Sequence, residues 1–143
     1  MTNPLTIGAI GVAVLALAIV AVIVVLRRRK KNRPLNTEKF ATQWQMVQSK
    51  LKDAALWPLA IIDADKLLDE ALKQKRYKGK TMGERLVAAQ RDIPNNDKVW
   101  FAHKLRNKLV HEQDIKVSKN MARDALLAVR EALRSLGALE KKK

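Results

Sequence analysis

The sequence predicts an all-α protein in which one N-terminal transmembrane helix precedes a small helical bundle. Residues 4–26 carry no charged side chain, and later segments show apolar residues at helical spacing. No segment shows the period-two alternation of a β-strand. We therefore expect residues 37–137 to form an antiparallel bundle of four main helices plus one short helix.

The N-terminal helix is predicted from the length of its apolar run and from the charges around it. About 20 apolar residues suffice for a helix to cross the hydrocarbon core, where it satisfies its own backbone hydrogen bonds. No basic residue precedes the run, and six follow it: Arg27, Arg28, Arg29, Lys30, Lys31 and Arg33. A cleaved signal peptide has the opposite charge order, so we expect a retained anchor. The positive-inside rule then places residues 1–3 outside the cell and the bundle in the cytoplasm.

The 143-residue chain is strongly basic, with a net charge of +15. Outside the segments 27–33 and 138–143, it still has 20 basic and 13 acidic residues. We interpret residues 27–36 as a basic juxtamembrane linker that contacts anionic lipid headgroups, and residues 138–143 as a basic tail. The chain has no cysteine, no glycine-rich phosphate loop and no H-E-x-x-H pattern. We therefore expect neither a cofactor nor a metal ion.

Capping residues and proline delimit the helices of the bundle. Asn36 or Thr37 suits the start of the first, whose apolar face extends to Leu51. Pro58 suits the first position of the second helix, which we expect to end near Lys75. Side chains that can cap precede the remaining helices: Thr81 with Glu84 in a capping box, Asn96 or Asp97, and Ser118. These open a short third helix, a fourth over residues 98–111 and a last one that ends near Gly137.

A basic segment separates the second and third helices. Its five basic residues are interrupted by no acidic one: Lys73, Lys75, Arg76, Lys78 and Lys80. Two interpretations remain open. The segment is either a solvated surface loop, which we favour, or a patch that binds polyanions.

The fourth helix places a cation within its apolar arc. At about 100° per residue, Arg106 falls among the apolar residues that include Phe101 and Leu105. A charge in such a position is costly unless it is paired. Asp65 and Asp69 border the apolar arc of the second helix, and we expect one of them to pair with Arg106. A partly exposed guanidinium can bind phosphate at the same time.

The segment Arg106-Asn107-Lys108-Leu109-Val110-His111 resembles the R-x4-H signature of HEPN domains, which carries a polar residue after the arginine. The resemblance covers residues 37–137 and implies a small all-α bundle with the motif near the end of a long helix. Many HEPN proteins are metal-independent ribonucleases that dimerise around a composite site, and others keep the fold without activity. The resemblance implies Arg106 as a phosphate ligand, His111 as the acid–base group and Asn107 as the residue that orients them.

A second resemblance concerns the architecture alone. Three segments are similar to bacterial single-span membrane proteins of unassigned function: Ala64-Asp65-Lys66-Leu67-Leu68-Asp69, Gly83-Glu84-Arg85-Leu86 and Ala102-His103-Lys104. It implies no chemistry. His103 lies outside the HEPN motif, and we expect it to have a packing or capping role.

Three functions are consistent with these observations. We favour binding of RNA or of a cytoplasmic protein partner without turnover, because nothing in the sequence specifies a substrate. The second is RNA cleavage without metal through Arg106, Asn107 and His111. Cleavage would require a homodimer, since one domain supplies one motif. The third is a structural role at the anionic leaflet of the membrane.

Overall fold

A computed structural model describes residues 4–31 and 33–141. All regular structure in these residues is helical, and none of them lies in a β-strand. The chain divides into two units, with the boundary between Arg33 and Pro34. The all-α class is thereby confirmed.

The first unit contains a single helix, α1, which runs Pro4–Lys31. Its 23-residue stretch Ile7–Arg29 is long and apolar enough to span a membrane. None of that stretch is buried within the protein, so it is not the core helix of a folded domain. Because α1 continues through Lys31, the first half of the expected basic linker is helical. Contact between these basic side chains and lipid headgroups stays a prediction.

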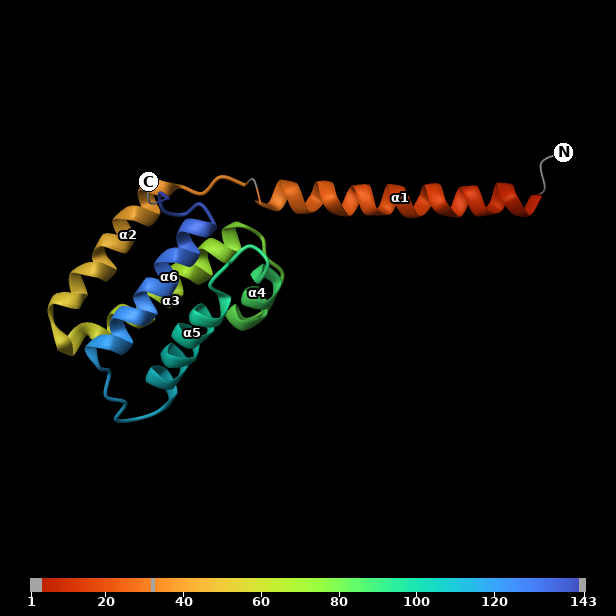
Figure 1. The fold of residues 1–143 in the computed structure, drawn as a ribbon. Helices are drawn as coiled ribbons and strands as arrows, with labels where there is room; N and C mark the ends of the chain where they lie inside the picture. The colour runs from red at the N-terminus through yellow and green to blue at the C-terminus, as the bar shows by residue number, and fades with distance from the viewer. Residues whose placement is uncertain (1–3, 32, 142–143) are drawn as a thin grey trace. The chain divides into compact units, whose positions relative to one another are not determined.

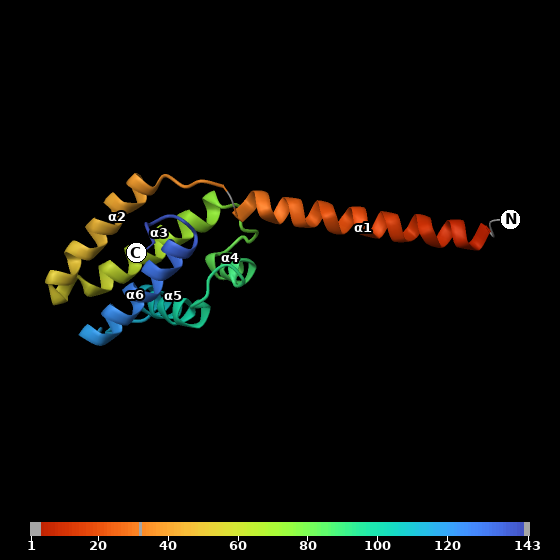
Figure 2. The same cartoon turned by 45° about the horizontal axis from the view of Figure 1, so that its top comes forward.

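The second unit is built from five further α-helices and two 3₁₀ turns in the described residues (Figures 1 and 2). In chain order these are α2 (Thr37–Ser49), η1 (Lys50–Lys52), η2 (Ala54–Leu56), α3 (Trp57–Gln74), α4 (Met82–Ala89), α5 (Asn96–His111) and α6 (Lys119–Ser135). Helix α3 packs against α2, α4, α5 and α6, and α5 also packs against α6. The finer prediction, an antiparallel HEPN-like bundle of four main helices, stays a prediction.

One apolar core holds these helices together. Its largest fully buried side chains come from every helix of the unit and include Phe40, Ile61, Leu86, Val99 and Leu133. Burial of a side chain of this size contributes roughly 1.5–3 kcal/mol to folding. The core therefore fixes which face of α3 and α5 points inward, and with it the polar residues on the borders of those faces.

The core extends beyond the predicted end of the bundle. Gly137 has a φ of +77°, in the left-handed region that favours glycine, and it ends α6 as expected. The chain then turns back, and the Ala138 N–H donates to the Leu133 carbonyl at 2.8 Å. Ala138 and Leu139 are both buried. The domain therefore includes these two residues, which we had expected to begin the basic tail.

Three of the predicted caps are present. The side chains of Asn36, Thr81 and Ser118 each accept a hydrogen bond from a backbone N–H of the following helix. The reciprocal bond of the capping box is shifted by one residue, because the Glu84 carboxylate accepts from the Lys80 N–H at 2.7 Å. Each cap satisfies a backbone donor that the helix itself leaves free.

Two helix starts differ from the prediction by one or two residues. Helix α3 begins at Trp57, which makes Pro58 its second residue. Helix α5 begins at Asn96 and has no side-chain cap, so the expected cap by Asn96 or Asp97 is wrong. The preceding residue, Asn95, instead donates its side-chain amide to the Ala128 carbonyl of α6 at 3.0 Å. This contact joins two helices, and such tertiary contacts cannot be inferred from local sequence.

Candidate functional site

A buried carboxylate on α3 forms the centre of a polar cluster against α5. Asp65 is 4% exposed, and its Oδ1 lies 3.0 Å from His103 Nδ1. The Nε of Arg106 lies 3.4 Å from Asp65 Oδ2. That distance is short enough for an ion pair, but the Nε–H makes no hydrogen bond. Arg106 is half-buried, with 27% of its side chain exposed, so its predicted pairing with Asp65 is confirmed.

Asn107 closes the cluster into a ring on α5. Its Oδ1 accepts a hydrogen bond from Arg106 Nη1 at 2.9 Å, and its Nδ2 lies 3.3 Å from His103 Nε2. Residues 103, 106 and 107 share one face of α5 because they are separated by three or four positions. The ring therefore follows from helix geometry once that face meets Asp65.

The donors and acceptors of the ring specify the protonation of His103. Arginine can only donate, so Asn107 must present its oxygen to Arg106 and its NH₂ to His103. Nε2 of His103 then accepts, which leaves the ring proton on Nδ1, where it is donated to Asp65. In this arrangement both nitrogens of His103 are engaged.

A second ion-pair cluster lies one turn further along α3. Arg85 of α4 donates from Nε to Asp69 Oδ1 at 2.7 Å, and its Nη1 donates to the Gly79 carbonyl at 2.7 Å. Its Nη2 lies 2.7 Å from the same Asp69 oxygen, as an ion pair. Lys73 pairs with the other Asp69 oxygen at 2.7 Å. Burial raises the pKa of Asp69, but the hydrogen bonds from Arg85 and Lys73 outweigh burial and hold its pKa below the ordinary value. The charged form of Asp69 is therefore the stable one.

Glycine is required at position 79 for this cluster to form. Gly79 has a φ of +151°, a conformation that other residues rarely adopt. A Cβ there would lie 2.7 Å from both the Arg85 backbone nitrogen and the Glu84 Cβ. The close approach lets the Gly79 carbonyl reach the Arg85 guanidinium.

The first cluster, together with Asp69 of the second, lines one pocket of about 430 Å³ between α3, α4 and α5. Its polar lining residues from α3 and α5 are Asp65, Lys66, Asp69, His103, Arg106 and Asn107. The start of α4 supplies the remaining wall, through Thr81, Met82 and Gly83. Lys66 is exposed and forms no ion pair with any other described residue. The pocket thus brings together the predicted Arg106, Asn107, Asp65 and Asp69.

His111 does not line this pocket. It is the last residue of α5 and is exposed to solvent. It lies five positions after Arg106, so it points about 140° away around the helix. The two residues implied by the HEPN resemblance therefore do not form a joint site within one copy of the described chain. The histidine in the pocket is His103.

The predicted basic patch has one member that is not on the surface. Lys75 is only 6% exposed, so its inclusion in the patch is wrong, whereas Lys73, Arg76, Lys78 and Lys80 are exposed. Arg76 has a φ of +59°, and this turn lets its neighbours face inward. Burial lowers the pKa of Lys75, and the nearby carboxylate of Asp92 opposes that shift.

The same turn buries a tyrosine beside Asp92. The Tyr77 hydroxyl donates to Asp92 Oδ2 at 2.7 Å. Burial, followed by the hydrogen bond and the negative charge of Asp92, raises the pKa of Tyr77 well above its ordinary value. The loop between α3 and α4 is therefore anchored to the core at this point.

Sequence reasoning missed Arg85 and Lys66. Arg85 is 7% exposed and lies on the buried face of α4 with Met82, Leu86 and Ala89. That spacing of three, four and seven residues was available in the sequence as a signal, as it was for Arg106. Lys66 gave no comparable signal, because an exposed lysine beside an aspartate is common. In the described residues, no group of three or more His, Cys, Asp or Glu side chains could hold a metal ion.

Replacing Asp65 should test whether the ring stabilises the domain. We expect Asp65→Ala to lower the free energy of unfolding by about 3 kcal/mol, because Arg106 and His103 lose their buried acceptor. The control is Asp63→Ala on the same helix, where a partly exposed carboxylate pairs with Lys50 at 3.3 Å. It should cost less than about 1 kcal/mol. Urea unfolding measures both, and equal costs would contradict a structural role for the ring.

The pKa of Asp69 predicts how stability depends on pH. Because its pKa is lowered on folding, Asp69 stabilises the domain above the unfolded value of about 4. That contribution is lost as the pH falls through the folded pKa. Asp69→Asn should therefore be less stable than the wild type at pH 7, and the difference should shrink below about pH 4. Urea unfolding across this pH range measures it, and a constant difference would refute the assignment.

No known protein family, curated protein or solved structure matches this chain. The HEPN resemblance therefore depends on the motif and its helical context.

Proposed function

We propose that the chain is a membrane-anchored binding protein whose helical domain holds phosphate groups of RNA at the Arg106 pocket, without turnover. The observation that carries the proposal is the half-buried guanidinium of Arg106, which the Asp65 ring holds in place at the pocket wall. A fixed, partly desolvated guanidinium is well suited to bind a phosphate oxygen.

The charges around the pocket favour an anion. Its two carboxylates, Asp65 and Asp69, are already engaged by His103 and Arg106 and by Arg85 and Lys73. Lys66 adds a cation that none of the described carboxylates neutralises. Four basic side chains, from Lys66, Lys73, Arg85 and Arg106, thus accompany two acidic ones. The excess positive charge is available to a ligand.

Unused donors in the pocket support the same inference. Arg106 Nη2 donates no hydrogen bond to any described residue, although Nη1 is engaged by Asn107. The first turn of α4 forms another wall, and the backbone N–H groups of Met82 and Gly83 there have no partner within the helix. Such groups carry a partial positive charge, which adds to the attraction for phosphate.

The exposed basic loop between α3 and α4 favours RNA over a protein partner. Lys73 pairs with a carboxylate that lines the pocket, and Lys80 directly precedes Thr81 in its wall. Arg76 and Lys78 lie between them along the loop and are exposed. RNA carries a negative charge at each phosphate, so a row of exposed basic side chains beside the pocket can contact successive phosphates.

Binding without turnover accounts better for the two histidines than cleavage does. His111 lies outside the pocket, and the nitrogens of His103 are occupied by Asp65 and Asn107. An acid–base catalyst must reach the proton that it transfers. Cleavage would therefore require a second copy of the chain to supply its own His111.

The proposed anchor is α1, with the helical domain in the cytoplasm. The basic residues at its C-terminal end support this orientation by the positive-inside rule. Protease added to intact cells should leave the domain undigested, and permeabilised cells should lose it. Digestion in intact cells would contradict the orientation.

The RNA proposal predicts a salt-dependent affinity that depends on Lys66. The full chain in zwitterionic nanodiscs should bind labelled single-stranded RNA in the presence of a chelator. Lys66→Gln should weaken binding and reduce the slope of log K against log salt by about 0.7, the value for one lost phosphate contact. Fluorescence anisotropy measures both quantities.

The matched control is Lys119→Gln, at an exposed position that begins α6 and lies outside the pocket. It should change neither the affinity nor the slope. Equal effects of the two variants would show that RNA binding does not involve the pocket. RNA cleavage that persists in chelator and stops in His111→Ala would replace binding with the ribonuclease alternative.

A further inference from the structure

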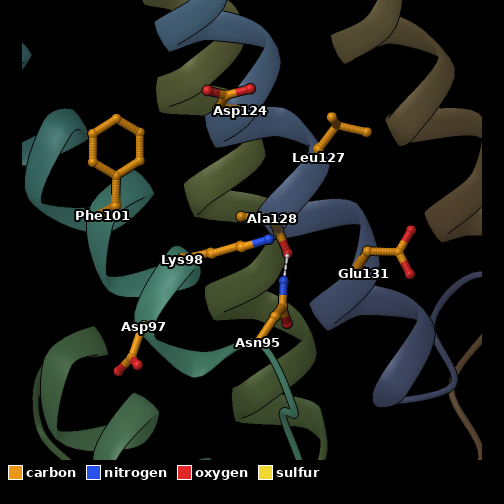
Figure 3. Close-up of a pocket in the computed structure, with 8 residues that line it drawn as sticks. All are labelled: Asn95, Asp97, Lys98, Phe101, Asp124, Leu127, Ala128 and Glu131. Atoms are coloured by element: carbon orange, nitrogen blue, oxygen red, sulfur yellow. Dashed lines mark hydrogen bonds between the residues drawn. The ribbon is translucent and has the colours of Figure 1, made fainter.

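A second surface on the domain is an apolar groove between α5 and α6. Phe101 of α5 and Leu127 of α6 lie on the two sides of this groove, and both are about two-fifths exposed, at 44% and 40% (Figure 3). The space between the helices is about 590 Å³ and is floored in part by Ala128. Large exposed apolar side chains on facing helices are typical of a surface that another chain covers.

The groove is held in shape by a contact between the two helices. The Asn95 side chain donates to the Ala128 carbonyl at 3.0 Å and thereby joins the start of α5 to the middle of α6 (Figure 3). The methyl side chain of Ala128 is too short to fill the space above it. The groove is therefore a built feature of the packed helices.

The groove is acidic although the protein is basic. Three carboxylates line it, from Asp97, Asp124 and Glu131, against the single ammonium of Lys98. The chain as a whole has a net charge of +15. Asp97 forms no ion pair with another described residue, and Asp124 has only its exposed neighbour Arg123, at 3.3 Å. Exposed pairs of this kind contribute less than about 1 kcal/mol, so Asp97 and Asp124 remain available to a ligand. Glu131 is already engaged, because it accepts a hydrogen bond from Arg134 Nη1 at 2.7 Å and lies 3.7 Å from Arg130 Nε.

We propose that this groove binds a basic amphipathic helix of a partner protein. On α6, Asp124, Leu127 and Glu131 follow one another at three and four residues along one ridge. The two carboxylates are two helical turns apart, about 10 Å, with an apolar side chain between them. A partner helix that places a cation against Asp124 and an apolar residue one turn away matches this ridge, and its apolar residue meets Phe101.

The carboxylates that line the groove argue against a second copy of the chain, anionic lipid or RNA as its occupant. In a twofold dimer the same patch faces itself, so the carboxylates that line the groove would face those of the other copy. Anionic lipid and RNA would be repelled by the carboxylates of Asp97 and Asp124. A basic helix is the occupant that covers the apolar side chains and neutralises the rim.

The groove is distinct from the RNA pocket. Phe101 and Arg106 are five residues apart on α5 and point about 140° away from each other. No residue lines both sites. Substitutions in the groove therefore leave RNA binding unchanged, and the two proposals fail independently.

The test uses the full chain in zwitterionic nanodiscs with two labelled helical peptides. One peptide carries leucine on one face and lysine on the other, and the second has glutamate in place of every lysine. Empty nanodiscs provide the blank for binding to lipid. We expect the basic peptide to bind the protein, and Phe101→Ala and the double variant Asp97→Asn/Asp124→Asn each to weaken binding about tenfold.

Two matched controls separate the groove from general effects on the surface. Val87→Ala removes an apolar side chain that is 57% exposed on α4, outside the groove. Asp114→Asn removes an exposed carboxylate at a position with a φ of +63°, which asparagine also tolerates. Both should bind the basic peptide like the wild type.

Three outcomes would overturn the proposal. Equal binding of the basic peptide to the wild type and the groove variants would place its site elsewhere. Equal binding of the acidic peptide would show that charge complementarity plays no part. Dimers of the wild type that Phe101→Ala converts to monomers, with unchanged peptide binding, would assign the groove to a second copy.

Discussion

The buried carboxylate of Asp65 is the constraint on which both surfaces of the domain depend. A carboxylate that is 4% exposed is costly without partners, so α5 must turn His103 and Arg106 toward α3. This requirement and the apolar core together set the rotation of α5 about its axis. Once the rotation is set, the exposed part of the Arg106 guanidinium faces the pocket, and Phe101 faces the groove on the opposite side of α5.

The inward position of Arg106 could be predicted because helical periodicity is a geometric property of the sequence. Val99, Ala102 and His103 precede Arg106 by seven, four and three residues, and all three are buried. The choice between Asp65 and Asp69 as its partner could not be predicted. That choice depends on Arg85, which reaches Asp69 from a separate helix and leaves Asp65 to α5. The helix limits set by caps and glycine were also predictable, since these signals act over four or five residues.

Spacing in a motif does not state which side chains meet. The spacing of Arg106 and His111 resembles a catalytic signature. However, His111 lies five positions after Arg106 and is the last residue of the helix. The basic composition of the segment led to a wrong prediction for Lys75, which is buried. That residue is surrounded by exposed cations in the sequence, and the backbone turn at Arg76 places it next to Asp92. The error at Lys75 concerns the path of the chain through the turn at Arg76, which local patterns do not encode. Joint action of Arg106 and His111 in a dimer stays a prediction.

The net charge of +15 conceals two surfaces of opposite sign on one small domain. A uniformly basic domain would bind any polyanion and would repel a basic partner from every side. Here α5 separates the basic pocket from the acidic groove, so the proposed RNA and the proposed helix have different sites. Because anchoring by α1 would hold both sites at one membrane, a partner that carries a basic helix and also binds RNA would engage them together. Its second contact would then form at a high effective concentration, and moderate affinity at each site would suffice for a stable complex.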